Sequence, residues 1–135
     1  MSKPFKPILC LDFDGVIHSY RSGWQGLTRI PDPPVNGALQ FIADALDVFR
    51  VAIFSTRSAS PGGIAAMREW LGRWSVDPVY GMPADFDYAK FSAIEWVTEK
   101  PPALVTIDDR AITFTGVWPD LQLLRNFKPW NKSDG

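Results

Sequence analysis

Short apolar runs alternate with segments of helical periodicity along most of the chain. Three runs, at 8–13, 49–54 and 103–107, are nearly continuous in hydrophobic character, as expected for strands covered on both faces. Shorter runs at 78–80 and 112–114 predict two further strands. Because strands that alternate with helices are typical of parallel sheets, the pattern predicts an α/β fold with about five strands flanked by helices.

Three segments carry apolar residues at helical spacing. The first spans 35–47 and the third spans 91–99. The second begins after Ser60, whose side chain is a good helix cap, with Pro61 in the first turn, and runs to about Trp74. These helices supply the connections that a parallel sheet requires.

Composition narrows the class of protein. The chain has 135 residues, 46% of them hydrophobic and 21% charged, which predicts one globular domain over 1–135 with a polar tail at 131–135 that frays. The net charge of −1 provides no global field for nucleic acid or anionic lipid. The single cysteine, Cys10, excludes an internal disulfide. Because the sequence shows no signal region and no apolar run of membrane length, we expect a soluble, cytoplasmic protein with no membrane contact and no obligate protein partner.

Two connections decide how open a site at the sheet would be. Residues 18–34 are too few for a domain but suit a hairpin with a glycine-bearing turn, a small flap over about 18–33. Residues 55–90 are largely consumed by a helix and a short strand. Neither connection leaves room for a cap domain.

Carboxylates follow the first predicted strand. Asp12 and Asp14 are two residues apart, so their side chains point the same way if the strand stays extended. In open α/β sheets, ligands bind outside the carboxyl ends of the strands. Taken alone, the run Asp12 to Gly15 equally suits a turn or a helix start.

The second strand ends in a similar way, with Ser55, Thr56 and Arg57. A hydroxyl group there suits a hydrogen bond to a phosphoryl oxygen, and an arginine suits a phosphate clamp. Taken alone, the three residues also fit a polar loop that leads to the helix cap.

Asp108, Asp109 and Arg110 close the strand at 103–107, and Lys90 precedes the third helix. Adjacent carboxylates repel each other by about 1 kcal/mol in water and about 4 kcal/mol at an effective dielectric constant of 20, so the pair calls for a cation or for exposure. A solvated turn paired with Arg110 and a surface Lys90 are the alternatives. Considered together, carboxylates from two strand ends beside a phosphate would require metal, which predicts Mg²⁺.

Taken in order, these segments resemble the four motifs of the haloacid dehalogenase superfamily. The matching segments are Leu-Asp-Phe-Asp-Gly-Val-Ile, Ile-Phe-Ser-Thr-Arg, a lysine, and Thr-Ile-Asp-Asp-Arg, within residues 8–110. The resemblance implies a Rossmann-like sheet and a phosphatase with a phosphoaspartate intermediate. The flap and the missing lid resemble the capless branch of the superfamily. More loosely, Ser-Thr-Arg and Asp-Asp-Arg are similar to the phosphatase half of polynucleotide kinases.

The resemblance implies a role for each matching residue. Asp12 would be the nucleophile and Asp14 the general acid/base, while Ser55 would hold the phosphoryl group. Lys90 would steady the phosphoaspartate, with Lys100 a poorer candidate for the same role.

Mg²⁺ would be bound by Asp12, Asp108, Asp109 and the backbone carbonyl of Asp14. Which of Asp108 and Asp109 ligates the metal directly stays open at this stage.

The substrate is expected to be a phosphorylated small molecule or a nucleic-acid terminus, because an open site must take its specificity from surrounding loops. Thr56, Arg57, Arg110 and, on the flap, Trp24 are the candidate binding residues. Arg110 suits a structural ion pair with Asp108 or Asp109 slightly better. The low net charge confines contact with a polymer to its end.

Two other classes of protein share parts of the pattern. A receiver domain is also α/β, binds Mg²⁺ and is phosphorylated on aspartate, but its paired acids resemble a pattern that follows the first strand. The second alternative is a phosphate-binding module without turnover. A phosphatase assay with and without Mg²⁺ separates the three.

Overall fold

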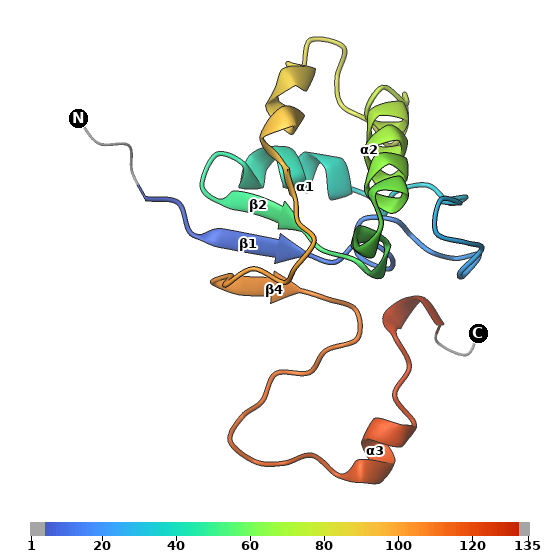
Figure 1. Cartoon of the computed structure of the whole chain (residues 1–135), viewed down its shortest axis with the longest axis vertical. Coiled ribbons are helices and arrows are strands. Elements are labelled where there is room, and N and C mark those ends of the chain that lie inside the picture. The colour runs from blue at the N-terminus through green and yellow to red at the C-terminus, as the bar shows by residue number, and fades with distance from the viewer. Residues whose placement is uncertain (1–4, 133–135) are drawn as a thin grey trace.

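Four short parallel strands form one sheet in the computed structural model, which describes residues 5–132 (Figure 1). The strand order is β3-β2-β1-β4, with β1 Ile8–Leu11, β2 Arg50–Ile53, β3 Glu95–Trp96 and β4 Val105–Ile107. The predicted α/β class and parallel sheet are confirmed. The described residues form four strands, however, and not about five.

Helices connect the strands as predicted in two of three cases. The α-helices are α1 Ala38–Ala45, α2 Pro61–Ser75 and α3 Leu121–Arg125, and 3₁₀ turns occur at η1 Thr56–Ala59, η2 Tyr88–Ala93 and η3 Trp130–Lys132. The start of α2 is the predicted one, because Ser60 Oγ accepts a hydrogen bond from the backbone N–H of Gly62. No described helix has both the length and the apolar character needed to cross a bilayer. Of the tail expected to fray, 133–135 lies outside the described residues.

One hydrophobic core holds the sheet against α1 and α2. Alternate strand residues point to the same face, and four such side chains are buried together with side chains of both helices. These residues are Leu9, Leu11, Val51, Ile53, Leu39, Ile42, Met67 and Trp70. Leu11 pairs with Ile53 on one side and with Ile107 on the other. Strands β1, β2 and β4 therefore end level with one another, which brings their following residues to one edge.

The strand predicted at 78–80 is a turn. The carboxylate of Asp77 accepts hydrogen bonds from the backbone N–H groups of Val79 and Tyr80, each at 2.9 Å. A side chain that satisfies these donors locally competes with a strand ladder for them. The prediction is wrong because it rested on the apolar character of 78–80, which does not reveal the turn that Asp77 stabilises.

The helix predicted at 91–99 is also wrong. Asp87 accepts a hydrogen bond from the N–H of Ala89 and starts η2 instead, and β3 follows at Glu95. Glu95 accepts two hydrogen bonds from Arg50 of β2, at 2.7 and 3.0 Å, which supports the strand pairing. Apolar residues three apart fit a 3₁₀ turn as well as an α-helix, so their spacing did not distinguish the two.

The predicted flap is an irregular loop and not a two-stranded hairpin. One antiparallel bridge between His18 and Pro34 closes its base, and the N–H of Ser19 donates to the carbonyl of Pro33. Three prolines at 31, 33 and 34 offer no N–H for a ladder. The loop nevertheless lies where the flap was expected, beside the carboxyl end of β1 (Figure 1).

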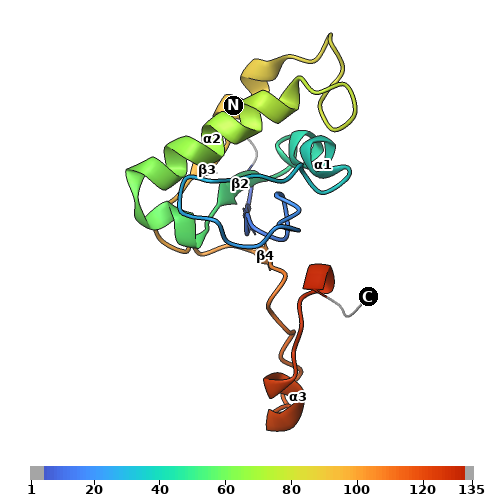
Figure 2. The ribbon, with the colours of Figure 1, turned by 90° about the vertical axis from the view of Figure 1, so that its right-hand side faces the viewer.

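The fifth strand predicted at 112–114 is exposed coil. A turn at Asp108, whose carboxylate accepts from the N–H of Arg110 at 2.9 Å, ends β4 and directs the chain away from the sheet. The segment that follows, including α3, projects from the body of the protein and returns only at η3 (Figures 1 and 2). Without a neighbouring strand, an apolar run cannot form a ladder.

Candidate active site

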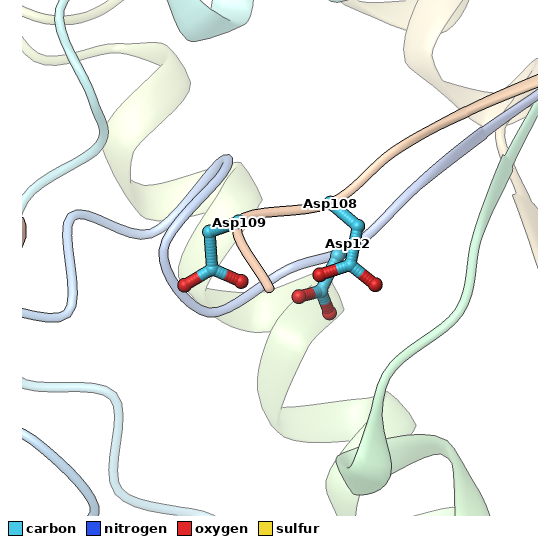
Figure 3. Close-up of side chains that lie close together, drawn as sticks. All are labelled: Asp12, Asp108 and Asp109. Carbon is cyan, nitrogen blue, oxygen red and sulfur yellow. The ribbon is translucent and has the colours of Figure 1, made fainter. Parts of the chain in front are cut away.

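Three carboxylates from two adjacent strand ends meet at the carboxyl edge of the sheet. Asp12 directly follows β1, and Asp108 and Asp109 directly follow β4. One oxygen from each lies within 4.8 Å of the other two (Figure 3). The backbone N–H of Asp12 donates to the carbonyl of Ile107 at 3.0 Å, which extends the β1–β4 pairing to the site. The predicted meeting of these three residues at one edge is confirmed.

The pKa of Asp12 is raised from its ordinary value of 3.8 to about 8. Burial of the carboxyl group is the largest cause, and the charges of Asp108 and Asp109 add to it. A hydrogen bond from the backbone N–H of Phe13, at 2.8 Å, acts in the opposite direction. Burial also raises the pKa of Asp109, which accepts a hydrogen bond from Asp12. Asp12 therefore keeps its proton to a higher pH than a free aspartate does.

Gly15 is required at its position for two reasons. Its φ of +84° lies in the left-handed region, which side chains rarely adopt. A Cβ atom there would also collide with the carboxylate of Asp109. The glycine thus lets the loop after β1 approach the residues after β4 closely enough to form the cluster.

Asp14 belongs to a second, separate group of side chains. Its Oδ1 lies 2.8 Å from Nδ1 of His18, and its Oδ2 accepts from Nε of Arg57 at 3.0 Å. The chain turns after β1, where Val16, Ile17 and His18 donate to the carbonyl of Phe13. The carboxylates of Asp12 and Asp14 therefore diverge, although both still line the same hollow.

His18 is fully buried and holds Asp14 in one orientation. The backbone N–H of Asp32 donates to Nε2 of His18 at 3.1 Å, so the other ring nitrogen, Nδ1, carries the proton and donates it to Asp14. The ring stacks on Phe13 and meets Trp70 and Tyr20 edge to face. This packing holds the imidazole ring in place beside Asp14.

The hollow beside the carboxylates has a volume of about 270 Å³ and is lined by residues from four segments: Asp12, Asp14, Tyr20, Trp24, Ser55, Thr56, Asp109 and Arg110. Ser55 Oγ accepts from the N–H of Arg57 at 3.1 Å, so its own hydroxyl proton is left to donate. Ser55 and Thr56 thus lie where the sequence predicted, at the end of β2 beside Asp12.

Arg57 faces the protein and not a ligand. Its side chain has no exposed surface; Nη1 donates to the carbonyls of Gly26 and Leu27, at 2.8 and 2.7 Å, and Nε donates to Asp14. The ring of Trp24 lies over the guanidinium, with its centroid 4.6 Å from Cζ. Arg57 therefore joins the loop to Asp14 through Nε and Nη1, while its Nη2 is buried without a hydrogen-bond partner.

Lys90 does not lie beside the carboxylates at the carboxyl edge of the sheet. Its Nζ lies 2.8 Å from the carboxylate of Asp47, which follows α1 and precedes β2 at the amino edge of the sheet. The length of a strand, about 13 Å for four residues, separates that edge from the carboxylates. Lys100 follows β3, and its charge lowers the pKa of Cys10 against the larger effect of burial.

Arg110 remains at the site as an exposed residue that lines the hollow. The predicted ion pair of its side chain with Asp108 or Asp109 is not found in the described part of the chain. Instead, the backbone N–H of Arg110 donates to Asp108. The side chain therefore provides positive charge at the mouth of the hollow.

Sequence reasoning missed His18, Asp32 and the C-terminal segment. His18 could have been identified from the sequence, because it is the only histidine in the chain and lies four residues after Asp14. The indole N–H of Trp130 donates to the carbonyl of Gly15 at 2.8 Å, and the side chain of Asn131 donates to the carbonyl of Ser19 at 3.0 Å. No local sequence pattern predicts these two contacts, because more than a hundred residues separate the partners.

Comparison with protein-family models, with curated proteins and with solved structures finds no match to this chain.

Proposed function

We propose that the protein is a Mg²⁺-dependent phosphomonoester hydrolase that acts through a phosphoaspartate on Asp12. The observation that carries the proposal is the meeting of Asp12, Asp108 and Asp109 within 4.8 Å, with Asp14 lining the same hollow. The motif order that resembles the haloacid dehalogenase superfamily supports the same assignment of roles.

The residues present fit a hard divalent cation. All three candidate ligands offer carboxylate oxygens, which Mg²⁺ prefers. Among residues 5–132, the ion pairs include no lysine or arginine side chain on Asp12, Asp108 or Asp109. Burial and the charges of Asp108 and Asp109 raise the pKa of Asp12, so its charged form is disfavoured unless an opposite charge lies nearby. A bound Mg²⁺ would offset this charge and polarise the phosphoryl oxygens.

In the first step, an oxygen of ionised Asp12 attacks phosphorus, and the bond from phosphorus to the ester oxygen breaks. The leaving oxygen takes a proton from protonated Asp14. The hydroxyl group of Ser55 donates to a phosphoryl oxygen, and the side chain of Arg110 offsets charge at the mouth of the hollow. The products are an alcohol and phosphoaspartate.

In the second step, water attacks the phosphorus of the acyl phosphate and gives a proton to the Asp14 carboxylate. The bond from phosphorus to Asp12 breaks, which releases inorganic phosphate and restores Asp12 and protonated Asp14. The hydrogen bonds that His18 and Arg57 donate to Asp14 hold its carboxyl group in one orientation. Because a poor leaving group needs the proton that Asp14 supplies, we expect its departure to be the slower step.

A second candidate function is a phosphate-binding module without turnover. One observation favours it: Lys90, the residue expected to steady the phosphoaspartate, is paired with Asp47 at the opposite edge of the sheet. Such a module would bind phosphate esters and release no phosphate from them.

Release of inorganic phosphate from a panel of monoesters, with Mg²⁺ and with excess chelator, tests the proposal. The wild type should turn over only with metal, and Asp12→Asn should abolish turnover. Asp85→Asn is a matched control, since Asp85 is an exposed aspartate outside the cluster. Binding of esters without turnover by the wild type would favour the binding module.

A further inference from the structure

The side chain of Trp24 lines the hollow, and the structure explains how the loop holds it there. The side chain lines the hollow together with Asp12 and Asp14 and is 51% exposed. One face of its ring covers the guanidinium of Arg57. Of the described ring contacts, none pairs Trp24 with another aromatic ring. One face is thus supported and the other is open.

The loop around Trp24 is fixed on both sides of it. On one side, Ser22 donates to the Asp32 carboxylate through its N–H, at 2.8 Å, and through its hydroxyl group, at 2.6 Å. On the other side, the carbonyls of Gly26 and Leu27 accept from Arg57. Because these contacts restrain the loop before any ligand binds, a planar group that stacks on the ring loses little binding free energy to ordering of the loop.

The dimensions of the hollow indicate what would reach the ring. A volume of about 270 Å³ lies below the roughly 300–1,000 Å³ of pockets that enclose a drug-sized ligand. A phosphate and its sugar can enter beside Asp12, but a larger leaving group must extend to the rim, where Trp24 is exposed. The guanidinium beneath the ring draws on its π-electrons, so the open face suits a neutral planar group better than a second cation.

We propose that Trp24 is a stacking platform for the base of a phosphorylated nucleoside, with Arg57 as its support. This inference rests on the proposed phosphatase function and names its substrate class. A free nucleoside and the end of an oligonucleotide both fit this proposal, because the chemistry at the ring is the same.

The test compares kcat/KM for phosphorylated ribose compounds with and without a base. Adenosine monophosphate, phosphorylated at the 3′ or the 5′ position, should be a better substrate than ribose 5-phosphate. Trp24→Ala should lower kcat/KM for the better nucleotide by roughly 5- to 150-fold, the range for removal of one base-stacking contact, and lower it much less for ribose 5-phosphate. Trp24→Phe should restore most of the loss. Trp118→Ala is the matched control, since that tryptophan is 83% exposed and lies outside the hollow.

An oligonucleotide with a terminal phosphate distinguishes the two sources of the nucleoside. Equal kcat/KM for mononucleotide and oligonucleotide means that only the terminal nucleoside is bound, and a higher value for the oligonucleotide identifies a nucleic-acid end as the substrate. A preference for ribose 5-phosphate, or an equal loss on all substrates in Trp24→Ala, would overturn the stacking proposal and leave the phosphatase intact.

Binding separates failure of this inference from failure of the proposed function. If no ester is hydrolysed, the phosphatase proposal fails, and calorimetry with the Asp12→Asn protein still tests the platform. Adenosine monophosphate should then bind more tightly than ribose 5-phosphate, and Trp24→Ala in the same background should remove the difference. Equal affinities for the two compounds would defeat the stacking proposal by itself. Thermal melts of each Trp24 variant check that the loop substitution leaves the fold intact.

Discussion

The raised pKa of Asp12 predicts that Asp12→Asn stabilises the metal-free protein. A carboxyl group whose pKa is higher in the folded state than in the unfolded state binds its proton more tightly when folded. Between about pH 4 and pH 8 the unfolded chain ionises Asp12 freely, while the folded protein keeps the proton. The free energy of unfolding therefore falls as pH rises through this window, and asparagine, which does not ionise, removes that fall.

The size of the effect follows from the same pKa. For a rise from 3.8 to about 8, at about 1.4 kcal/mol for each tenfold change in proton affinity, the upper limit is roughly 6 kcal/mol. Because Asp109 shares the proton, we expect Asp12→Asn to recover about half of this. For a domain of this length, a gain of about 2–3 kcal/mol raises the melting temperature by roughly 10 °C. Asparagine also keeps the acceptor for the N–H of Phe13 and can donate to Asp109.

The assay is thermal unfolding in excess chelator at pH 5 and at pH 8. The stabilisation by Asp12→Asn should be large at pH 8 and small at pH 5. Saturating Mg²⁺ should raise the melting temperature of the wild type more at pH 8, because metal and proton compete for the same carboxylate. Asp85→Asn, at an exposed position, should change neither value. A destabilised Asp12→Asn at pH 8, or a difference independent of pH, would refute the reasoning.

Three further predictions follow from the site. Gly15→Ala should lower the affinity for Mg²⁺, measured by calorimetry, because the new methyl group displaces Asp109; unchanged affinity would contradict the close approach. Lys90→Ala should leave kcat unchanged and cost at most about 1 kcal/mol of stability, as expected for a partly exposed ion pair with Asp47; a large loss of kcat would support a catalytic role for this lysine. His18→Gln should lower kcat more on esters with poor leaving groups than on activated esters, and an equal effect on both would argue for a purely structural role.

The parts of the fold that the sequence predicted are those encoded by local pattern. Ser60 and Pro61 mark the start of α2 because a cap and a first-turn proline act within one helical turn. The apolar runs of β1, β2 and β4 identify the strands, and parallel pairing then brings Asp12 to Asp108 and Asp109 without any knowledge of tertiary contacts.

The parts that could not be predicted depend on side chains that compete for backbone hydrogen-bond donors, or on contacts between residues far apart in the sequence. The Asp77 side chain takes the donors that the strand expected at 78–80 needed. The position of Lys90 depends on Asp47, more than forty residues away, and not on its own neighbours in sequence. Arg57 has the residue type of a phosphate clamp, but the carbonyls and the indole that surround it come from a loop whose path prolines and glycines determine.

The most direct test of the phosphatase proposal is to trap the covalent intermediate. The protein is mixed with Mg²⁺ and a monoester labelled in its phosphoryl group, quenched in acid during turnover and digested, and the label is mapped to a peptide. The account predicts an acid-stable, base-labile label on the peptide that contains Asp12, and no label in Asp12→Asn. Sustained Mg²⁺-dependent turnover with no label on Asp12, or with full activity in Asp12→Asn, would contradict it.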